Sequence, residues 1–127
     1  MKLRIRGNSV RIRVSKSELA QIEESGAAQD SVRFSAHSAL IYRVEVKPGG
    51  RIEAEFDGAR LRIAVPRDDV ARWLAPGEVS IEAEQQIGDG VALKVLVEKD
   101  FACLAPRDSE DDSDLFDNPV QAGARSE

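Results

Sequence analysis

The chain has 127 residues, 42% of them hydrophobic and only 5% aromatic, which suits one domain with a core of Val, Ile, Leu and Ala. Of its 18 basic and 23 acidic side chains, 16 of each lie in residues 1–106, so the net charge of −5 belongs to residues 107–127. We therefore expect one domain over residues 1–106 and an acidic, largely extended tail over residues 107–127. A neutral domain also lacks the overall basic footprint that nucleic-acid-binding domains usually carry.

The expected compartment follows from the cysteine count and the first residues. The single cysteine, Cys103, excludes an internal disulfide framework and suits a reducing compartment. Residues Met1–Val14 alternate charged and apolar side chains without a long apolar run, so they resemble neither a secretory signal nor a membrane span. We expect a cytoplasmic protein with no membrane partner.

The first predicted elements are a hairpin and a helix. Charged and apolar residues alternate over Lys2–Arg6 and Val10–Val14, which is the period of strands with one apolar face. Gly7–Ser9 lies between them and has the composition of a turn. The Ser15–Glu18 spacing fits a capping box and predicts a helix that ends by Gly26.

The same patterns predict further elements. In chain order they are strands at Val32–Phe34 and Leu40–Lys47, a hairpin of Ile52–Phe56 and Leu61–Val65 around Asp57-Gly58, a helix from Pro66 to before Pro76, and a hairpin of Val79–Glu84 and Val91–Val97. The second helix would bury Val70, Trp73 and Leu74.

Three stretches repeat a charged strand, a turn, a second strand and a helix start: Lys2–Leu19, Arg51–Leu74 and Ser80–Leu104. Such a repeat indicates the architecture. We predict a mostly antiparallel α+β fold in which ββαββ occurs twice, with about eight short strands and two short helices. Grouped one strand later, the order is β-α-β-β-β taken twice. The strands either close into a small barrel or form an open sheet that curls around the helices.

The charged sides of these strands support two interpretations. They form a solvated face with cross-strand ion pairs, each contributing about 0.2–1 kcal/mol, or they line the lumen of a closed barrel. In a lumen, arginines would hold an anion, and glutamates two apart would point the same way toward Mg²⁺ or Mn²⁺. The candidate anion-binding residues are Arg4, Arg6, Arg11, Arg13, Arg60 and Arg62, and the candidate metal ligands are Glu53, Glu55, Glu82 and Glu84.

The duplicated order with Glu-x-Glu and Arg-x-Arg strands is similar to the CYTH (triphosphate tunnel) superfamily. The resemblance implies an eight-stranded tunnel that binds triphosphates through basic residues and a metal held by glutamates. That superfamily has Glu-x-Glu-x-Lys near its N-terminus, whereas this chain begins with Lys2, Arg4 and Arg6. Its own Glu-x-Glu pairs are internal and are followed by Asp57 and Gln86.

Two further resemblances concern the ends of the chain. Met1–Arg11, Glu98–Leu104 and Glu110–Asp114 resemble a family of short bacterial proteins of unknown function, and this similarity spans nearly the whole chain. It implies a compact bacterial domain and no activity. The stretch from Gly7 to Leu19 also resembles the opening of swapped-hairpin antitoxins, which present basic strand residues to DNA.

Neither Cys103 nor His37 has the neighbours of a catalytic or zinc site, and a buried cysteine and a loop histidine are expected instead. The acidic run from Asp108 to Asp114 does not fit an EF-hand loop, because the sixth position is not glycine and Pro119 stands where the bidentate Glu would be. We expect a solvated tail, which could also cover the basic first hairpin of its own chain.

The sequence favours a non-enzymatic cytosolic binding or regulatory domain whose basic hairpin or polar sheet face meets an anionic small molecule or a protein partner. The alternatives are a metal-dependent protein that binds or hydrolyses triphosphates in a tunnel and an antitoxin-like DNA-binding domain. Mg²⁺ or Mn²⁺ is expected only for the tunnel.

Overall fold

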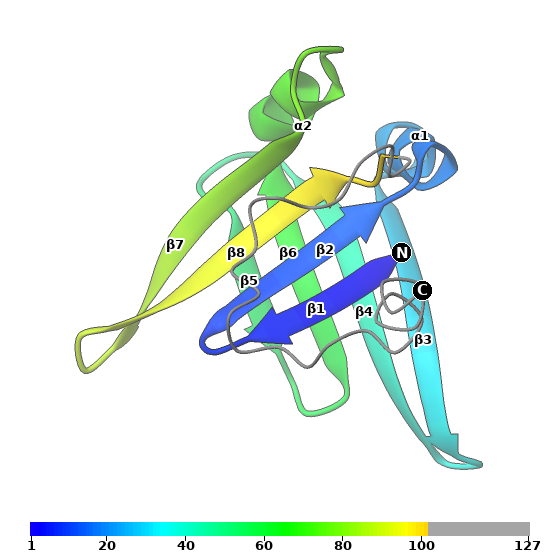
Figure 1. Ribbon diagram of the computed structural model, residues 1–127, viewed down its shortest axis with the longest axis vertical. Helices are drawn as coiled ribbons and strands as arrows, with labels where there is room; N and C mark the ends of the chain where they lie inside the picture. The colour runs from blue at the N-terminus through cyan, green and yellow to red at the C-terminus, as the bar shows by residue number, and fades with distance from the viewer. Residues whose placement is uncertain (102–127) are drawn as a thin grey trace, which may run out of the picture.

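The computed structural model describes residues 1–101, which contain eight strands and two helices (Figure 1). In chain order these are β1 (Lys2–Arg6), β2 (Ser9–Val14), α1 (Lys16–Ser25), β3 (Ala27–Ser35), β4 (Ser38–Lys47), β5 (Glu53–Phe56), β6 (Arg60–Pro66), α2 (Arg67–Leu74), β7 (Ser80–Gly88) and β8 (Val91–Lys99). The predicted α+β class and the order ββαββ taken twice are confirmed. The predicted domain boundary after residue 106 and the tail lie outside the described residues.

The strands form two four-stranded sheets. Sheet A has the order β1-β2-β8-β7, and sheet B has the order β3-β4-β6-β5. Each hairpin is antiparallel, whereas the two central contacts, β2 with β8 and β4 with β6, are parallel. In both sheets the parallel contact joins the first half of the chain to the second, so each sheet needs both halves.

The two halves are related by an internal pseudo-two-fold axis. Exchanging them maps β1, β2, α1, β3 and β4 onto β5, β6, α2, β7 and β8, and it converts the strand order of sheet A into that of sheet B. The helices lie at one end of the two layers, and the four hairpin turns lie away from them (Figure 1). We call these the helix end and the open end.

Both helices begin where the sequence places them, although by different means. The Ser15 hydroxyl accepts a hydrogen bond from the Glu18 amide, and the Glu18 carboxylate accepts one from the Ser15 amide, which completes the predicted capping box. Gly26 ends α1 with a left-handed φ of 91°, a conformation that glycine adopts without a steric cost. The second helix has no side-chain cap: Pro66 precedes it, and Asp68 and Asp69 lie in its first turn, where the helix dipole favours anions.

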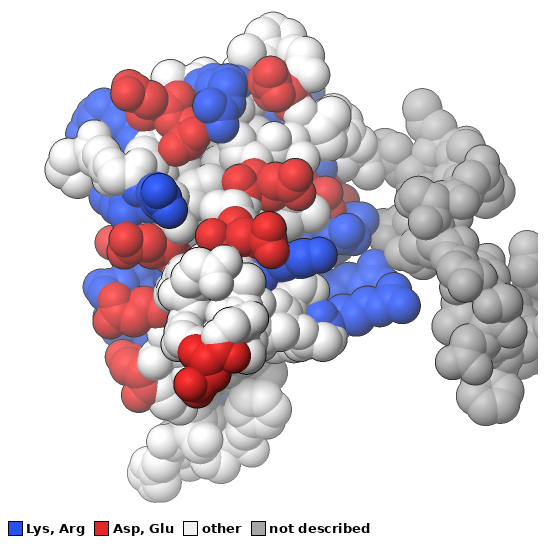
Figure 2. Space-filling view, turned by 90° about the vertical axis from the view of Figure 1, so that its left-hand side faces the viewer, with Lys and Arg blue, Asp and Glu red and all other residues white. Residues whose placement is uncertain are grey.

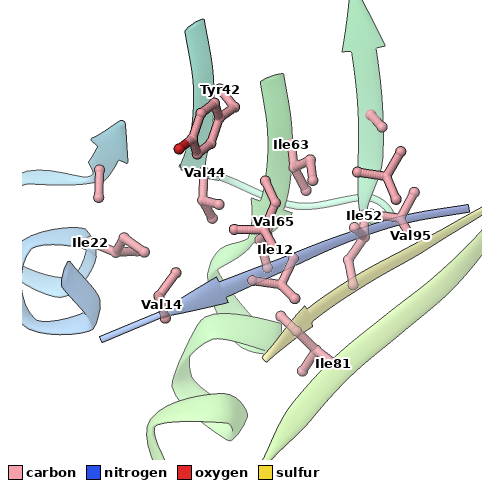
Figure 3. Close-up of a cluster of buried hydrophobic side chains, with 14 of the residues drawn as sticks. Ile12, Val14, Ile22, Tyr42, Val44, Ile52, Ile63, Val65, Ile81 and Val95 are labelled. Carbon is pink, nitrogen blue, oxygen red and sulfur yellow. The ribbon is translucent and has the colours of Figure 1, made fainter. Parts of the chain in front are cut away.

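The core lies between the inward faces of the two sheets and is closed by the helices at one end. It follows the pseudo-symmetry, since Ile12 and Val14 in β2 correspond to Ile63 and Val65 in β6, and all four are fully buried (Figure 3). Trp73 of α2 is also fully buried and donates its indole N–H to the carbonyl oxygen of Val79. Within residues 1–101, no charged or polar residue is buried.

The prediction of a closed barrel with a charged lumen is therefore wrong, and the open alternative is confirmed. Apolar side chains occupy the interior because burying them is favourable, whereas burying unpaired charges is costly. The alternating charges consequently lie on the outer faces of both sheets. The open form differs from the expected sheet curled around the helices, because it has two sheets and both helices lie at one end of them.

Two sets of contacts hold the layers together at their edges. The amide side chain of Gln85 on β7 accepts a hydrogen bond from the Ala54 backbone N–H of β5 at 2.7 Å and donates one to the Ala54 carbonyl oxygen at 3.0 Å. At the other edge, the amino group of Met1 contacts the Glu18 carboxylate at 2.7 Å, and the Tyr42 hydroxyl donates to the Met1 carbonyl oxygen at 3.2 Å.

Two details depart from the predicted elements. Strand β3 has nine residues instead of three, because pairing with β4 keeps a polar stretch extended that has little strand pattern of its own. The stretch Ser80–Leu104 is also no third repeat, since β7 and β8 are the last hairpin of the second half.

Past Lys99 the chain stays beside β2, where the Asp100 amide donates to the Val14 carbonyl oxygen.

Candidate functional site

The outer face of sheet A brings like charges together on β1 and β2. The register places Lys2 opposite Arg13 and Arg4 opposite Arg11, and the alternation of the strands directs all four side chains outward. Like charges directly opposite each other on neighbouring strands are destabilising. The arrangement therefore needs negative charge nearby.

Two acidic residues at the end of β8 supply part of that charge. The Glu98 carboxylate accepts a hydrogen bond from Arg13 at 2.5 Å and lies 3.6 Å from Arg11, and the Asp100 carboxylate lies 2.9 Å from the Lys2 ammonium. These two carboxylates offset two of the four positive charges in the rows Lys2–Arg13 and Arg4–Arg11. Toward the open end, Arg6 and Lys94 form no ion pair with any other described residue.

The equivalent rows of sheet B are charge-complementary. Glu55 on β5 takes the position that Arg4 has on β1, and its carboxylate lies 2.7 Å from Arg62. The hydrogen bond from Arg62 to Glu55, together with the negative charge of that carboxylate, raises the pKa of Arg62. Glu53 takes the position of Lys2 and lies 3.6 Å from Lys47. The two edge strands thus have opposite charge at equivalent positions.

We call the set Arg4, Arg6, Arg11, Arg13 and Lys94 the basic face. A surface cavity of about 560 Å³ adjoins the basic face. Arg11 of β2 lines one side of it, together with Lys94 and Leu96 of β8, the strand between β2 and β7. Glu82 and Glu84 of the edge strand β7 form the opposite side. In the space-filling view, basic side chains gather at the side of the molecule that carries sheet A, whereas acidic and basic side chains alternate on the side of sheet B (Figure 2).

The structure brings together four of the six arginines predicted to bind an anion. Arg4, Arg6, Arg11 and Arg13 share the basic face, whereas Arg60 and Arg62 lie on the outer face of sheet B. Arg62 is already paired with glutamates, and the amide of Arg60 is bound by the Asp57 carboxylate in the β5–β6 turn. Backbone hydrogen bonds from Arg60 and Ala59 lower the pKa of Asp57.

The four glutamates predicted to bind metal lie on different sheets. Glu53 and Glu55 are on the edge strand β5 of sheet B, and Glu82 and Glu84 are on the edge strand β7 of sheet A. Within residues 1–101, no three His, Cys, Asp or Glu side chains are grouped so that they could hold a metal ion. His37 lies in the exposed β3–β4 turn, and Cys103 lies outside the described residues.

Glu45 and Glu98 were not among the predicted site residues, although they organise the arginines of both faces. Arg62 reaches Glu45 across the parallel contact of β4 with β6, and Arg11 and Arg13 reach Glu98 across that of β2 with β8. The residues paired in these contacts are 19 and 85 positions apart in the chain, and local periodicity gives no sign of them. A hint is that Glu45 and Glu98 each directly follow a buried valine, Val44 and Val97, and each has a lysine within the next two residues.

A family model matches residues 1–120. The chain belongs to DUF7009, a family of unknown function. This confirms the predicted resemblance to an uncharacterised family, and the DUF7009 match includes the acidic run from Asp108 to Asp114. No curated protein and no solved structure matches the chain, so the similarity to the CYTH superfamily gains no support. Neither helix within residues 1–101 is long and apolar enough to cross a membrane.

Proposed function

We propose that this DUF7009 protein is a non-enzymatic cytosolic binding domain whose basic face holds an extended acidic segment of a partner protein. The observation that carries the proposal is the contrast between the two halves. Equivalent rows pair Arg62 with Glu55 in sheet B but place Arg4 opposite Arg11 in sheet A. The fold therefore accommodates complementary rows, whereas sheet A places two positive side chains opposite each other.

The spacing of the basic face favours an extended segment. Side chains two residues apart on a strand point the same way and lie about 6.8 Å apart, because each residue advances by about 3.4 Å. Arg4 and Arg6 on β1, and Arg11 and Arg13 on β2, have this spacing. Acidic side chains on one side of an extended peptide repeat at the same distance, and arginine binds carboxylates with two parallel hydrogen bonds. A compact phosphate ligand would meet fewer of these side chains at once.

A calorimetric titration with hexaglutamate at low salt tests the proposal. The variant Arg6→Gln with Lys94→Gln should weaken binding about tenfold, since two exposed charge-assisted contacts together contribute about 1–2 kcal/mol. The matched control is Arg51→Gln with Arg60→Gln, which removes the same charge from exposed positions in the loop before β5 and on β6 of sheet B. That control should bind like the wild type.

Tripolyphosphate and duplex DNA are titrated alongside the peptide. If tripolyphosphate binds more tightly than the peptide, the ligand is a small anion and not an acidic segment. If DNA binds more tightly, the antitoxin-like alternative is favoured. If no probe binds at low salt, or if the control variant weakens binding as much as the Arg6 and Lys94 variant, the proposed site is wrong.

A further inference from the structure

Large apolar side chains are exposed at the open end. Six of the eight exposed large hydrophobic residues in the described part of the chain lie there: Ile5, Val32, Phe34, Phe56, Ile87 and Val91. By strand alternation, each is on the inward side of its strand and continues the row of core residues past the point where the layers cover it. We call these six residues the open-end patch.

Two of the hairpins extend past their neighbouring strands as arms. Strand β6 begins to pair with β4 at Ile41, and β2 begins to pair with β8 at Lys94. Residues 32–40 and residues 85–93 therefore continue as two-stranded ribbons, which project on opposite sides of the open end (Figure 1). The second ribbon is joined at its base to β5 through Gln85 and to the β1–β2 turn through Asn8. An isolated two-stranded ribbon is at best marginally stable in water, and exposed apolar clusters commonly mark interaction sites.

The open-end patch obeys the pseudo-two-fold symmetry of the chain. Ile5 on β1 corresponds to Phe56 on β5, with exposures of 65% and 61%, and Phe34 on β3 corresponds to Ile87 on β7, with exposures of 70% and 53%. A partner that covers both sides of this patch equally well must present two similar halves itself. A second copy of the chain does so, and a two-fold interface is self-complementary by construction.

The charges of the arms agree with such a pairing. The 32–40 arm contains Arg33 and no acidic residue, and the 85–93 arm contains Asp89 and no Lys or Arg. Arg33 is held at the tip by a hydrogen bond to the Ala36 carbonyl oxygen, and neither Arg33 nor Asp89 has an ion-pair partner within residues 1–101. When two copies meet end to end, one of the two simple two-fold arrangements places each 32–40 arm against the 85–93 arm of the other copy.

From this geometry we infer that the protein is a homodimer that associates through the open end, with the Arg33 arm of each copy on the Asp89 arm of the other. The open-end patch becomes the apolar centre of the interface, and two Arg33–Asp89 contacts lie at its rim. The basic face of sheet A remains accessible on the outside. This dimer does not depend on the proposed acidic ligand.

Sedimentation velocity of the full chain tests the inference over about 1 μM to 1 mM, a range that covers weak to moderately tight association. Wild type should form dimers. Phe34→Glu and Ile87→Glu should each raise the dissociation constant by about 30-fold or more, as expected for buried aromatic and aliphatic anchors. The controls are Val79→Glu and Phe101→Glu, which change the two exposed hydrophobic residues outside the patch and should leave the dimer unchanged.

A double-mutant cycle tests the arm pairing with substitutions that the fold tolerates. Arg33→Gln and Asp89→Asn should each weaken the dimer, and the double variant should weaken it little more than either one alone, because both remove the same contact. Asparagine suits the left-handed φ of 54° at position 89. A monomeric wild type would overturn the inference, and another partner would then have to cover the open-end patch. A dimer insensitive to Phe34→Glu would place the interface elsewhere. Additive effects of Arg33→Gln and Asp89→Asn would rule out the arm pairing.

Discussion

Glu45 and Glu98 occupy equivalent positions in the two halves, and each carboxylate is shared by two arginines. Glu45 lies 3.0 Å from Arg43 and 3.9 Å from Arg62, whereas Glu98 contacts Arg13 and Arg11. Arg62 has a second carboxylate in Glu55, but Arg11 and Arg13 have no other anionic partner within residues 1–101. Glu98 is therefore the only anionic partner of its two arginines within residues 1–101, whereas Arg62 has Glu55 in addition to Glu45.

This difference predicts unequal effects of removing the two carboxylates. Glu98→Gln should lower the free energy of unfolding by about 1–2 kcal/mol at low salt, because Arg11 and Arg13 then lose their anionic partner within residues 1–101. Glu45→Gln should cost less, since Glu55 still pairs with Arg62. Urea denaturation in low and high salt measures both, and the Glu98 effect should shrink in 1 M salt, where screening reaches about 3 Å. Equal costs for the two variants would show that sheet A carries no excess repulsion.

Glu18 predicts a pH dependence of stability. Partial burial raises the pKa of its carboxyl, but hydrogen bonds from the N-terminal ammonium and from Ser15 outweigh this and lower the pKa below its ordinary value of 4.5. A lowered pKa stabilises the folded state above the ordinary pKa, and this stabilisation is lost as the pH falls through the folded pKa. Glu18→Gln should therefore lower the free energy of unfolding by about 1 kcal/mol at pH 7.

The difference between wild type and Glu18→Gln should narrow as the pH falls below 4.5. Thermal or urea unfolding from pH 7 to pH 3 measures this, with Glu23→Gln on the exposed side of α1 as the control. A difference that stays constant over this range would mean that the Glu18 charge does not matter.

The contact between Gln85 and Ala54 predicts a local effect at the junction of the sheets. Gln85→Leu leaves the Ala54 N–H and carbonyl groups without their partner, which costs about 1–3 kcal/mol for partly buried groups. Amide hydrogen exchange at Ala54 should become faster. Gln86→Leu changes the neighbouring residue, which points to the other face of β7, and should leave exchange at Ala54 as it is. Unchanged exchange in the Gln85 variant would show that the bond does not close this edge.

The acidic C-terminal residues give a prediction that rests on composition. Residues 107–127 carry seven of the 23 acidic side chains and lie outside the described residues, and we propose that they compete with external anions for the basic face. Deleting residues 108–127 should then tighten hexaglutamate binding at low salt, with less effect at high salt. Unchanged affinity at low salt would count against self-occlusion.

Most of the fold was predictable because its signals are local. The capping box at Ser15–Glu18, the left-handed Gly26 and the alternation in β2 and β6 each act within a few residues. The parallel contacts of β2 with β8 and β4 with β6 were not predictable, because they join strands far apart in the chain. These contacts arrange the strands in two sheets instead of one closed barrel, and so the charged lumen was wrongly expected.

The candidate site was predictable only in part for the same reason. The basic composition of β1 and β2 identified Arg4, Arg6, Arg11 and Arg13, but Lys94 joins them only because β8 pairs with β2. Arg60 and Arg62 have the same local pattern, yet the glutamates of β4 and β5 pair with Arg62. Strand order therefore determines which arginines lie beside other positively charged side chains.

We propose that sheet A, and not sheet B, binds an acidic segment. A nuclear magnetic resonance titration of the labelled full chain with hexaglutamate at low salt tests it most directly. We expect the amide shifts to concentrate on Arg6, Ser9, Arg11 and Lys94 and to disappear at high salt. Shifts centred on Arg60 and Arg62, or none at low salt, would contradict it.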